Sequence, residues 1–246
     1  MKIKCLSCTA EIDESAKVCP GCGYQRELAP PTLDLSGVTR PKSVIGLIVC
    51  FLVDRTGSSD EFANGIKTMI RKTLETIEPR IETLRVSVVT YGDEDEGQHP
   101  EFLCQQVTSD ESLEQVGGIV FSGGGLPRES HESAVEFAAE NVPWAESRKE
   151  ARNALVVFST AETKPTKSGR SAKEIGEILG AKNVQFFCVV EPYPFHYDMC
   201  DGCNGLVFSI SNDPDPSDIE KIGGQLAATL TASATSGTAA PATVTV

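Results

Sequence analysis

Apolar runs typical of β-strands alternate along most of this chain with amphipathic stretches typical of α-helices. The alternation extends from Val44 to about Ala232. Two of the strand-like runs are almost wholly apolar, as expected for strands that are buried on both faces of a parallel sheet. The pattern therefore predicts an α/β domain over residues 44–232, with a mostly parallel sheet flanked by helices. A chain of 246 residues with 40% hydrophobic composition is long enough for one such domain and a small appendage.

The individual elements follow from the period of the apolar residues. The expected strands are Val44–Val53, Leu84–Tyr91, Glu101–Gln106, Asn153–Ser159, Val184–Val190 and Gly205–Ile210. The expected helices are Glu61–Glu78, Ser112–Val120, Ser130–Val142, Ala172–Leu179 and Pro216–Leu230.

Three further segments differ from this domain in composition. Residues 1–26 contain a cluster of cysteines, and residues 27–43 form a linker with Ala29-Pro30-Pro31 and other turn-favouring residues. Residues 233–246 are small and uncharged, without an amphipathic period, which predicts a disordered tail.

The cysteine cluster has the spacing of a metal site. Cys5 and Cys8 form one CxxC pair, and Cys19 and Cys22 form a second pair ten residues further on. Four thiolates complete a tetrahedral shell around Zn²⁺ and leave no position for water, so we expect a structural zinc site. A segment this short depends on such an ion to fold. The CxxC and CPxCG motifs resemble the bacterial zinc-ribbon family, whose members commonly make protein contacts and in some cases bind nucleic acid.

A second candidate site follows the first strand of the α/β domain. Asp54, Thr56 and Ser58 lie directly before a predicted helix, and ligands of open α/β sheets collect at the carboxyl ends of strands. One carboxylate and two hydroxyls are hard oxygen ligands that suit Mg²⁺ or Mn²⁺, with water and a partner's carboxylate completing the shell. The alternative is that the three side chains only cap the following helix.

The motif Asp54-Arg55-Thr56-Gly57-Ser58 is similar to the metal-ion-dependent adhesion site of von Willebrand factor A (vWA) domains, which reads D-x-[ST]-x-S. The bacterial subgroup of that family also carries YRD, GGGDxPE and a strand ending in TD. Tyr91-Gly92-Asp93, Gly123–Glu129 and Ser159-Thr160-Ala161 correspond to these motifs. The resemblance implies a vWA-like, Rossmann-like fold and a binding face at the strand ends that includes Asp93, Glu129 and Thr160.

Two positions depart from this family pattern. Leu126 and Thr160 stand where the family motifs carry Asp, so two carboxylates that would help to hold a divalent cation are missing. Asp93, Glu129 or Glu162 would have to compensate for that loss.

The sequence His196-x3-Cys200-x2-Cys203 falls between two predicted strands, in a segment expected to be a loop. A second zinc site there would need a fourth ligand, for which Cys188 and His99 are the candidates. A redox-active dithiol and ordinary, partly buried cysteines are the alternatives.

Charge and hydropathy restrict the partners. The formal net charge of −13, with no basic block, disfavours a nucleic-acid partner. The beginning of the chain has no signal-peptide pattern, and the apolar run Val44–Val53 is too short to span a membrane, so we expect a cytoplasmic protein without membrane contact.

Together these features predict a non-enzymatic adaptor that binds another protein through the strand-end face, with the zinc ribbon as a second contact module. The resemblance to bacterial vWA proteins implies a MoxR-type AAA+ ATPase or a kinase or phosphatase as partner in a multi-protein bacterial system. The alternative is a nucleic-acid-binding accessory protein that acts through the ribbon, where Lys2, Lys4, Lys17 and Arg26 make the segment locally basic. A third class is an enzyme, either a metal-dependent hydrolase or a thiol oxidoreductase.

Overall fold

The computed structural model describes residues 2–4, 11–13, 46–123, 128–159, 161–203, 205–211 and 214–236. The chain divides into two compact units, Met1–Pro41 and Lys42–Val246. The described part of the first unit is a pair of short antiparallel strands, β1 (Lys2–Lys4) and β2 (Glu11–Asp13). The second unit contains the α/β domain.

A six-stranded sheet forms the centre of this domain, with the strand order β10-β9-β7-β3-β4-β5. All neighbouring pairs are parallel except β4 and β5, which are antiparallel. The prediction of a mostly parallel sheet is therefore confirmed. The strands are β3 (Gly46–Asp54), β4 (Leu84–Tyr91), β5 (Glu101–Val107), β7 (Ala151–Ser159), β9 (Val184–Val190) and β10 (Leu206–Ser209).

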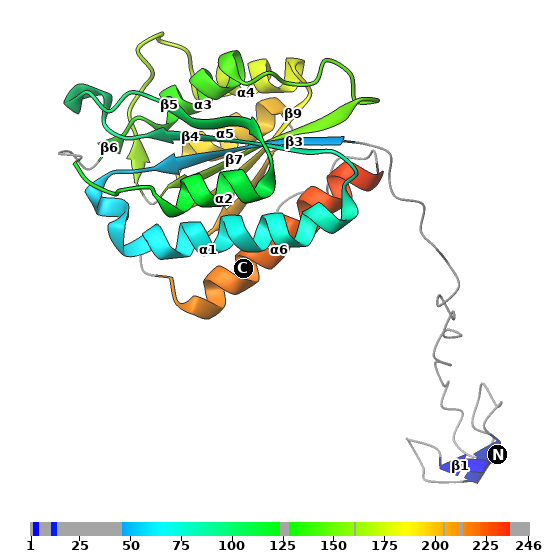
Figure 1. Ribbon diagram of the computed structural model, residues 1–246. Helices are drawn as coiled ribbons and strands as arrows, with labels where there is room; N and C mark the ends of the chain where they lie inside the picture. The colour runs from blue at the N-terminus through cyan, green and yellow to red at the C-terminus, as the bar shows by residue number, and fades with distance from the viewer. Residues whose placement is uncertain are drawn as a thin grey trace. The chain divides into compact units, whose positions relative to one another are not determined.

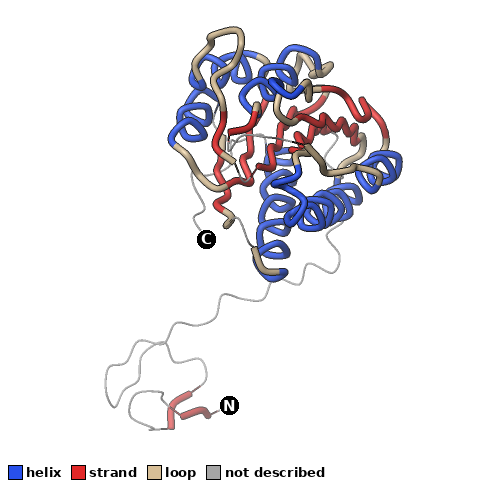
Figure 2. The backbone as a smooth tube through the Cα atoms, turned by 90° about the vertical axis from the view of Figure 1, so that its left-hand side faces the viewer, coloured by secondary structure: helices blue, strands red, loops and turns tan. Residues whose placement is uncertain are grey.

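Helices cover both faces of the sheet (Figures 1 and 2). Helices α1, α2 and α6 lie on one face, and α3, α4 and α5 lie on the other (Figure 1). Their bounds are α1 (Asp60–Ile77), α2 (Ser109–Gly117), α3 (His131–Asn141), α4 (Ala172–Ala181), α5 (Pro194–Cys203) and α6 (Pro216–Ser236). Short elements complete the domain: η1 (Gly57–Ser59), η2 (Glu78–Arg80), η3 (Glu94–Glu96), β6 (Arg128–Glu129) and β8 (Glu162–Thr163).

Two separate apolar layers result from this arrangement. Alternate residues of the central strands point to opposite faces. Phe51 and Val53 of β3 pack with Ile66 and Leu74 of α1 in one layer, whereas Leu52 of β3 belongs to the other layer. The strands are thus buried on both sides, which explains why the sequence of β3 is an unbroken apolar run rather than an alternating one.

Helix α2 begins three residues before the predicted start. Thr108 and Glu111 form a capping box, in which the Thr108 hydroxyl accepts from Glu111 N and the Glu111 carboxylate accepts from Thr108 N. These reciprocal bonds satisfy the first amides of the helix and move its start from Ser112 to Ser109.

Two predictions were wrong. The segment expected to be a loop around His196 is helix α5, because His196, Met199, Cys200 and Cys203 recur at helical spacing and all four are buried. The disordered tail expected over 233–246 does not begin at 233, because α6 continues to Ser236 and buries Ser233 and Ala234. Small residues without charge are typical of disordered tails, but their size also suits a helix that packs closely on another helix, as α6 does on α1. The rest of the expected tail, residues 237–246, lies outside the described residues.

The carboxyl ends of the three central strands meet at one edge of the sheet. In the strand register Asp54 lies beside Tyr91, and Val53 lies beside Phe158. The Tyr91 hydroxyl donates to Phe158 O at 3.2 Å and connects β4 to β7 underneath this edge. Strands β4 and β7 flank β3 in the sheet, and the chain continues from β3 first to β4 and later to β7. The edge at the carboxyl ends of these strands is therefore the topological switch point, where open α/β sheets bind ligands.

No helix among the described residues is long and apolar enough to cross a membrane.

Candidate functional site at the strand ends

Asp54 is the last residue of β3, and its side chain is fully buried. Its Oδ1 atom accepts hydrogen bonds from Thr56 N at 2.9 Å and from Thr56 Oγ1 at 2.7 Å. Its Oδ2 atom is buried and has no hydrogen-bond partner among the described residues. Burial raises the pKa of Asp54 above its ordinary value, although the bonds from Thr56 act in the opposite direction. A buried carboxylate oxygen without a partner is costly, so this atom marks a place for a cation or a water.

These contacts test the alternative that Asp54 and Thr56 only cap the next helix. Asp54 accepts from the loop residue Thr56, and the N-cap residue of α1, Ser59, makes no side-chain capping bond. Capping of α1 therefore does not account for the position of Asp54. The side chain of Ser58 lies outside the described part of the chain, which covers only its backbone within η1.

Backbone hydrogen bonds fix the loop that carries Asp54 and Thr56. Arg55 N donates to Tyr91 O at 2.9 Å, Ser122 N donates to Arg55 O at 2.9 Å, and Gly57 N donates to Gly123 O at 2.8 Å. A Cβ atom on Gly57 would lie 3.1 Å from Gly123 O, and Gly123 has a φ of +79° that favours glycine. The loop is thus held on two sides by strand β4 and by the segment that follows α2.

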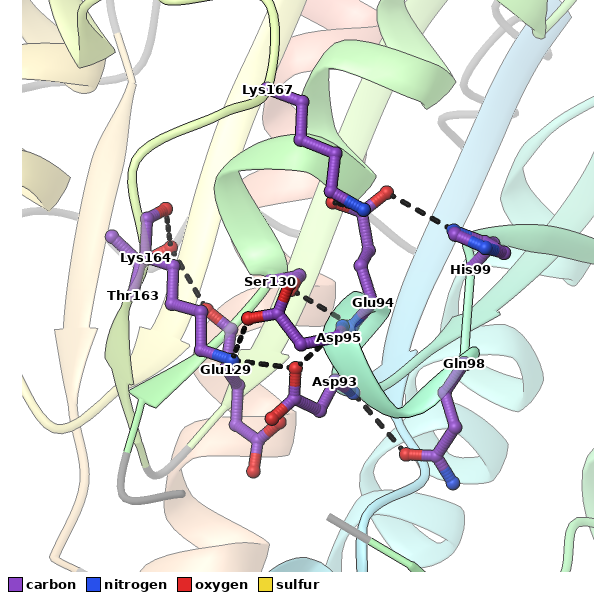
Figure 3. Close-up of polar contacts among 10 residues, drawn as sticks. All are labelled: Asp93, Glu94, Asp95, Gln98, His99, Glu129, Ser130, Thr163, Lys164 and Lys167. Atoms are coloured by element: carbon purple, nitrogen blue, oxygen red, sulfur yellow. Dashed lines mark hydrogen bonds and ion pairs between the residues drawn. The ribbon is translucent and has the colours of Figure 1, made fainter. Parts of the chain in front are cut away.

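Asp93 lies two residues after β4, and its side chain is fully buried. Its Oδ1 atom accepts from Asp95 N at 2.9 Å and from Lys164 Nζ at 2.5 Å (Figure 3). Its Oδ2 atom has no partner in the part of the chain that the structure describes. Burial acts to raise the pKa of Asp93, but the bonds from Lys164 and Asp95 outweigh it and hold the pKa below its ordinary value. This carboxyl group is therefore ionised.

Glu129 is held at the same edge by a short strand pair. Strands β6 and β8 are parallel, with Glu129 opposite Thr163, and Lys164 N donates to Glu129 O at 2.8 Å. The Glu129 carboxylate points toward the carboxylate of Asp93 (Figure 3). Its Oε2 atom is buried, and no described residue forms a hydrogen bond with it. Burial and then the negative charges of Asp54 and Asp93 raise the pKa of Glu129 to about 7.

Three buried carboxylates therefore lie near one another at the strand ends, and each has one oxygen without a hydrogen-bond partner within the described ranges. Oxygen atoms of this kind suit a hard divalent cation. Among the described residues, no three His, Cys, Asp or Glu side chains are placed to hold one metal ion together. One carboxylate, that of Asp54, with the Thr56 hydroxyl and water is a type of donor set that Mg²⁺ takes, because Mg²⁺ retains several of its waters.

The other candidate residues lie in different surroundings. Glu162 forms an exposed ion pair with Arg128 at 3.0 Å and does not join the three carboxylates. Thr160 and Leu126 lie outside the described residues, as do Cys5, Cys8, Cys19 and Cys22. In the sequence, Cys5 and Cys8 fall between the paired strands β1 and β2.

The residues proposed for a second zinc site belong to the core. Cys200 and Cys203 of α5 are buried against the apolar layer of α3 and α4, and Cys203 Sγ donates to Met199 O at 3.2 Å. The ring of His196 stacks on that of His131, with centroids 5.4 Å apart, while His99 pairs with Glu94 elsewhere. Within the described part of the chain these side chains form no group able to hold a metal.

Two residues of the strand-end site were not predicted from the sequence. Gln98 accepts from Asp93 N at 3.2 Å and donates to Ser122 O at 2.8 Å, which links the loops after β4 and α2. Lys164 contacts Asp93 and Asp95, from the loop that follows β8. Neither residue belongs to a recognisable motif, and only the pairing of β6 with β8 brings Lys164 to this edge.

Two open hollows are lined in part by the residues that follow Asp54 and Asp93 in the chain, Arg55 and Glu94. One of about 240 Å³ is lined by residues that include Arg55, Glu101, Phe102 and Val120. Another of about 370 Å³ is lined by residues that include Glu94, Glu136, Lys167 and Arg170. Both are open to solvent and carry charges of both signs, which suits a protein surface better than an enclosed small molecule.

The sheet order, the helix layers and the strand-end carboxylates define an α/β domain with a ligand-binding edge. Comparison of the sequence with known families identifies it further: residues 49–224 match the von Willebrand factor type A domain, and the chain belongs to this family. Domains of this family commonly mediate protein–protein interaction. The predicted vWA-like α/β fold is thereby confirmed, whereas the predicted zinc ribbon lies outside the described residues.

Solved structures agree with the family assignment. The crystal structure of the SpRpn10 VWA domain is similar, with a TM-score of 0.58 and 12% sequence identity, over 73% of this chain and 94% of that one. The proximal thread matrix protein 1 (PTMP1) from the mussel byssus is also similar, with a TM-score of 0.52 and 11% identity, over 76% of this chain and 47% of that one. Identities this low support the fold alone. No curated protein sequence matches the chain significantly.

Proposed function

We propose that this protein is a non-enzymatic adaptor that binds another protein through the strand-end face of its vWA domain. The observation that carries the proposal is a set of three buried carboxylate oxygens that have no hydrogen-bond partner among the described residues: Asp54 Oδ2, Asp93 Oδ2 and Glu129 Oε2. A core that needed only stability would not retain three buried acidic groups at one edge, each with an oxygen that lacks a partner among the described residues. A divalent cation bound at Asp54 would account for this excess of negative charge, because it would contact Asp54 and attract the nearby charges of Asp93 and Glu129.

Asp54, with the hydroxyls of Thr56 and Ser58, would hold Mg²⁺ or Mn²⁺. When bound, the ion supplies an electrophilic contact for a carboxylate of the partner. The chain's own residues do the remaining work. Asp93 and Glu129 supply negative charge close to Asp54, and the hydrogen bonds at Arg55 and Gly57 fix the loop in advance. A preformed loop reduces the entropy lost on binding.

The wider proposal includes the first unit of the chain. Cys5, Cys8, Cys19 and Cys22 bind a structural Zn²⁺, and this ribbon provides a second contact with the partner. We propose a cytoplasmic complex of bacterial type, with a MoxR-type AAA+ ATPase or a kinase or phosphatase as the partner. Two separate contacts would increase the affinity through effective concentration.

Affinity capture with a matched set of variants tests this function. The full chain, its Asp54→Asn variant and its Glu82→Gln variant are used as bait, because Glu82 is exposed at the amino end of β4, the opposite edge of the sheet. Asn at position 54 retains an oxygen acceptor for the Thr56 bonds and removes the charge. Buffers with and without Mg²⁺ are compared without a chelator, so that zinc stays in place.

The proposal expects a protein that is captured by the wild type and by Glu82→Gln in Mg²⁺ and lost with Asp54→Asn. Equal capture by all three baits, with or without Mg²⁺, would show that the partner binds elsewhere.

A further inference from the structure

Lys164 places a positive charge against the carboxylates of the strand-end site. Its Nζ atom lies 2.5 Å from Asp93 Oδ1 and 2.9 Å from Asp95 Oδ2, and its side chain is 18% exposed. Figure 3 shows the ammonium group between these two carboxylates, beside Glu129. An ammonium group so near a buried carboxylate is a counter-ion supplied by the chain itself.

The backbone around Lys164 is fixed, so this contact is part of the fold. Lys164 N donates to Glu129 O at 2.8 Å, and the preceding Thr163 Oγ1 accepts from Glu132 N at 3.1 Å. The pairing of β8 with β6 thus connects the position of Lys164 to that of Glu129. The long side chain above this anchored backbone retains several rotatable bonds, and it can leave Asp93 without a change in the backbone.

We propose that Lys164 is an internal counter-cation that competes with the divalent cation for the negative charge of the strand-end site, and so sets the affinity of that site. This inference rests on the proposed cation site. Lys164 neutralises Asp93 when no divalent ion is present, which keeps a buried carboxylate from standing unpaired. While Lys164 contacts Asp93, its ammonium group neutralises that carboxylate, so Asp93 attracts a divalent ion at Asp54 less strongly. The ammonium group also repels the ion directly.

Two substitutions separate the charge of Lys164 from its size. Lys164→Gln removes the charge and keeps a hydrogen-bond donor for Asp93, and Lys164→Arg keeps the charge. The affinity for Mn²⁺ alone is measured by electron paramagnetic resonance on the full chain. We expect Lys164→Gln to bind Mn²⁺ about tenfold more tightly than the wild type, and Lys164→Arg to remain within about threefold of it.

A measurement on the wild type checks the same point without a substitution at this position. Amine-reactive labelling of Lys164 is quantified by mass spectrometry, with the exposed Lys173 as internal reference. Competition expects Mg²⁺ to increase the labelling of Lys164 relative to Lys173 several-fold, and expects no increase in Asp54→Asn. If Lys164→Gln does not fold, this measurement decides the question.

Each result has a distinct meaning. A wild type that binds Mn²⁺ with a Lys164→Gln variant of equal or lower affinity overturns the role of Lys164 and leaves the cation site intact. Labelling of Lys164 that does not respond to Mg²⁺ also overturns it. Absence of Mn²⁺ binding in every variant removes both the cation site and the competition. Binding in Lys164→Gln but not in the wild type supports the competition and shows that Lys164 closes the site to metal.

Discussion

The strand-end edge and the corner between α4 and α5 both gather residue types that bind metals, and they differ in how well the fold satisfies those residues. At the strand ends Asp54, Asp93 and Glu129 are buried, and one carboxylate oxygen of each has no hydrogen-bond partner among the described residues. In the corner Cys200 and Cys203 belong to an apolar layer, and the Cys203 thiol donates to a backbone carbonyl. A thiol can be buried in a core at little cost because it behaves as a small apolar group, whereas burying a carboxylate without a partner is costly. Ligand chemistry alone therefore does not identify a site; the unsatisfied charge does.

The close packing of the corner can be broken by a single methyl group. A Cβ atom at Gly176 of α4 would lie 2.2 Å from Met199 O of α5, so the two helices would have to separate. We expect Gly176→Ala to lower the free energy of unfolding by about 3 kcal/mol. Urea denaturation measures the change.

Gly224→Ala in α6 is the matched control, since no atom of the described residues lies within 4 Å of its added Cβ, apart from its chain neighbours and the helix's own backbone. That variant should gain about 0.5 to 1 kcal/mol from better helix propensity. Equal stabilities of the two variants would mean that the corner is loose enough to open around a ligand.

The strand-end site should show its unsatisfied charge in the pH dependence of stability. The pKa of Glu129 is about 7 in the folded chain and takes its ordinary value near 4.5 when unfolded. The folded state therefore holds the proton more tightly, and the stabilisation is complete below pH 4.5 and lost as the pH rises through 7. We expect the metal-free wild type to lose about 2 kcal/mol relative to Glu129→Gln between pH 5 and pH 8.

Chemical denaturation of both proteins at several pH values gives this difference directly, because groups common to both cancel. Parallel stability curves for the two proteins would show that burial and the charges of Asp54 and Asp93 do not raise the pKa of Glu129.

Zinc content sharpens the comparison with the smallest change in stability. Cys200→Ala should lower the free energy of unfolding by about 1 kcal/mol and leave the zinc content of the purified protein unchanged, because Cys200 acts as a small core residue. Cys19→Ser, in the proposed ribbon, should abolish zinc binding. Elemental analysis by mass spectrometry distinguishes them, and loss of zinc in Cys200→Ala would restore the idea of a metal site in α5.

Much of the fold could be predicted because the central strands are buried on both faces. Their apolar runs are unambiguous, and β4 and β9 were predicted with the bounds that the structure has. Helix α5 could not be predicted from periodic apolar residues, because a histidine and two cysteines occupy three of its buried positions. The end of α6 was missed because small residues on a packed helix resemble a low-complexity tail.

The candidate site divides in the same way. Asp54, Asp93 and Glu129 could be predicted because each follows or forms part of a motif at a strand end. Lys164 could not, because its contact with Asp93 spans 71 residues of sequence and depends on the pairing of β6 with β8. Long-range contacts between charged side chains in loops leave no periodic pattern, so the balance of charge at the site requires the three-dimensional structure.

The central claim is that the strand-end face binds a divalent cation at Asp54. Thermal unfolding with and without Mg²⁺ tests this claim most directly. The full-length wild type and Asp54→Asn are compared at pH 8, where Glu129 is mostly ionised. The claim predicts that saturating Mg²⁺ stabilises the wild type, by about 1.4 kcal/mol at ten times the dissociation constant, and leaves Asp54→Asn unchanged. An identical response of both proteins to Mg²⁺, or none in either, would contradict it.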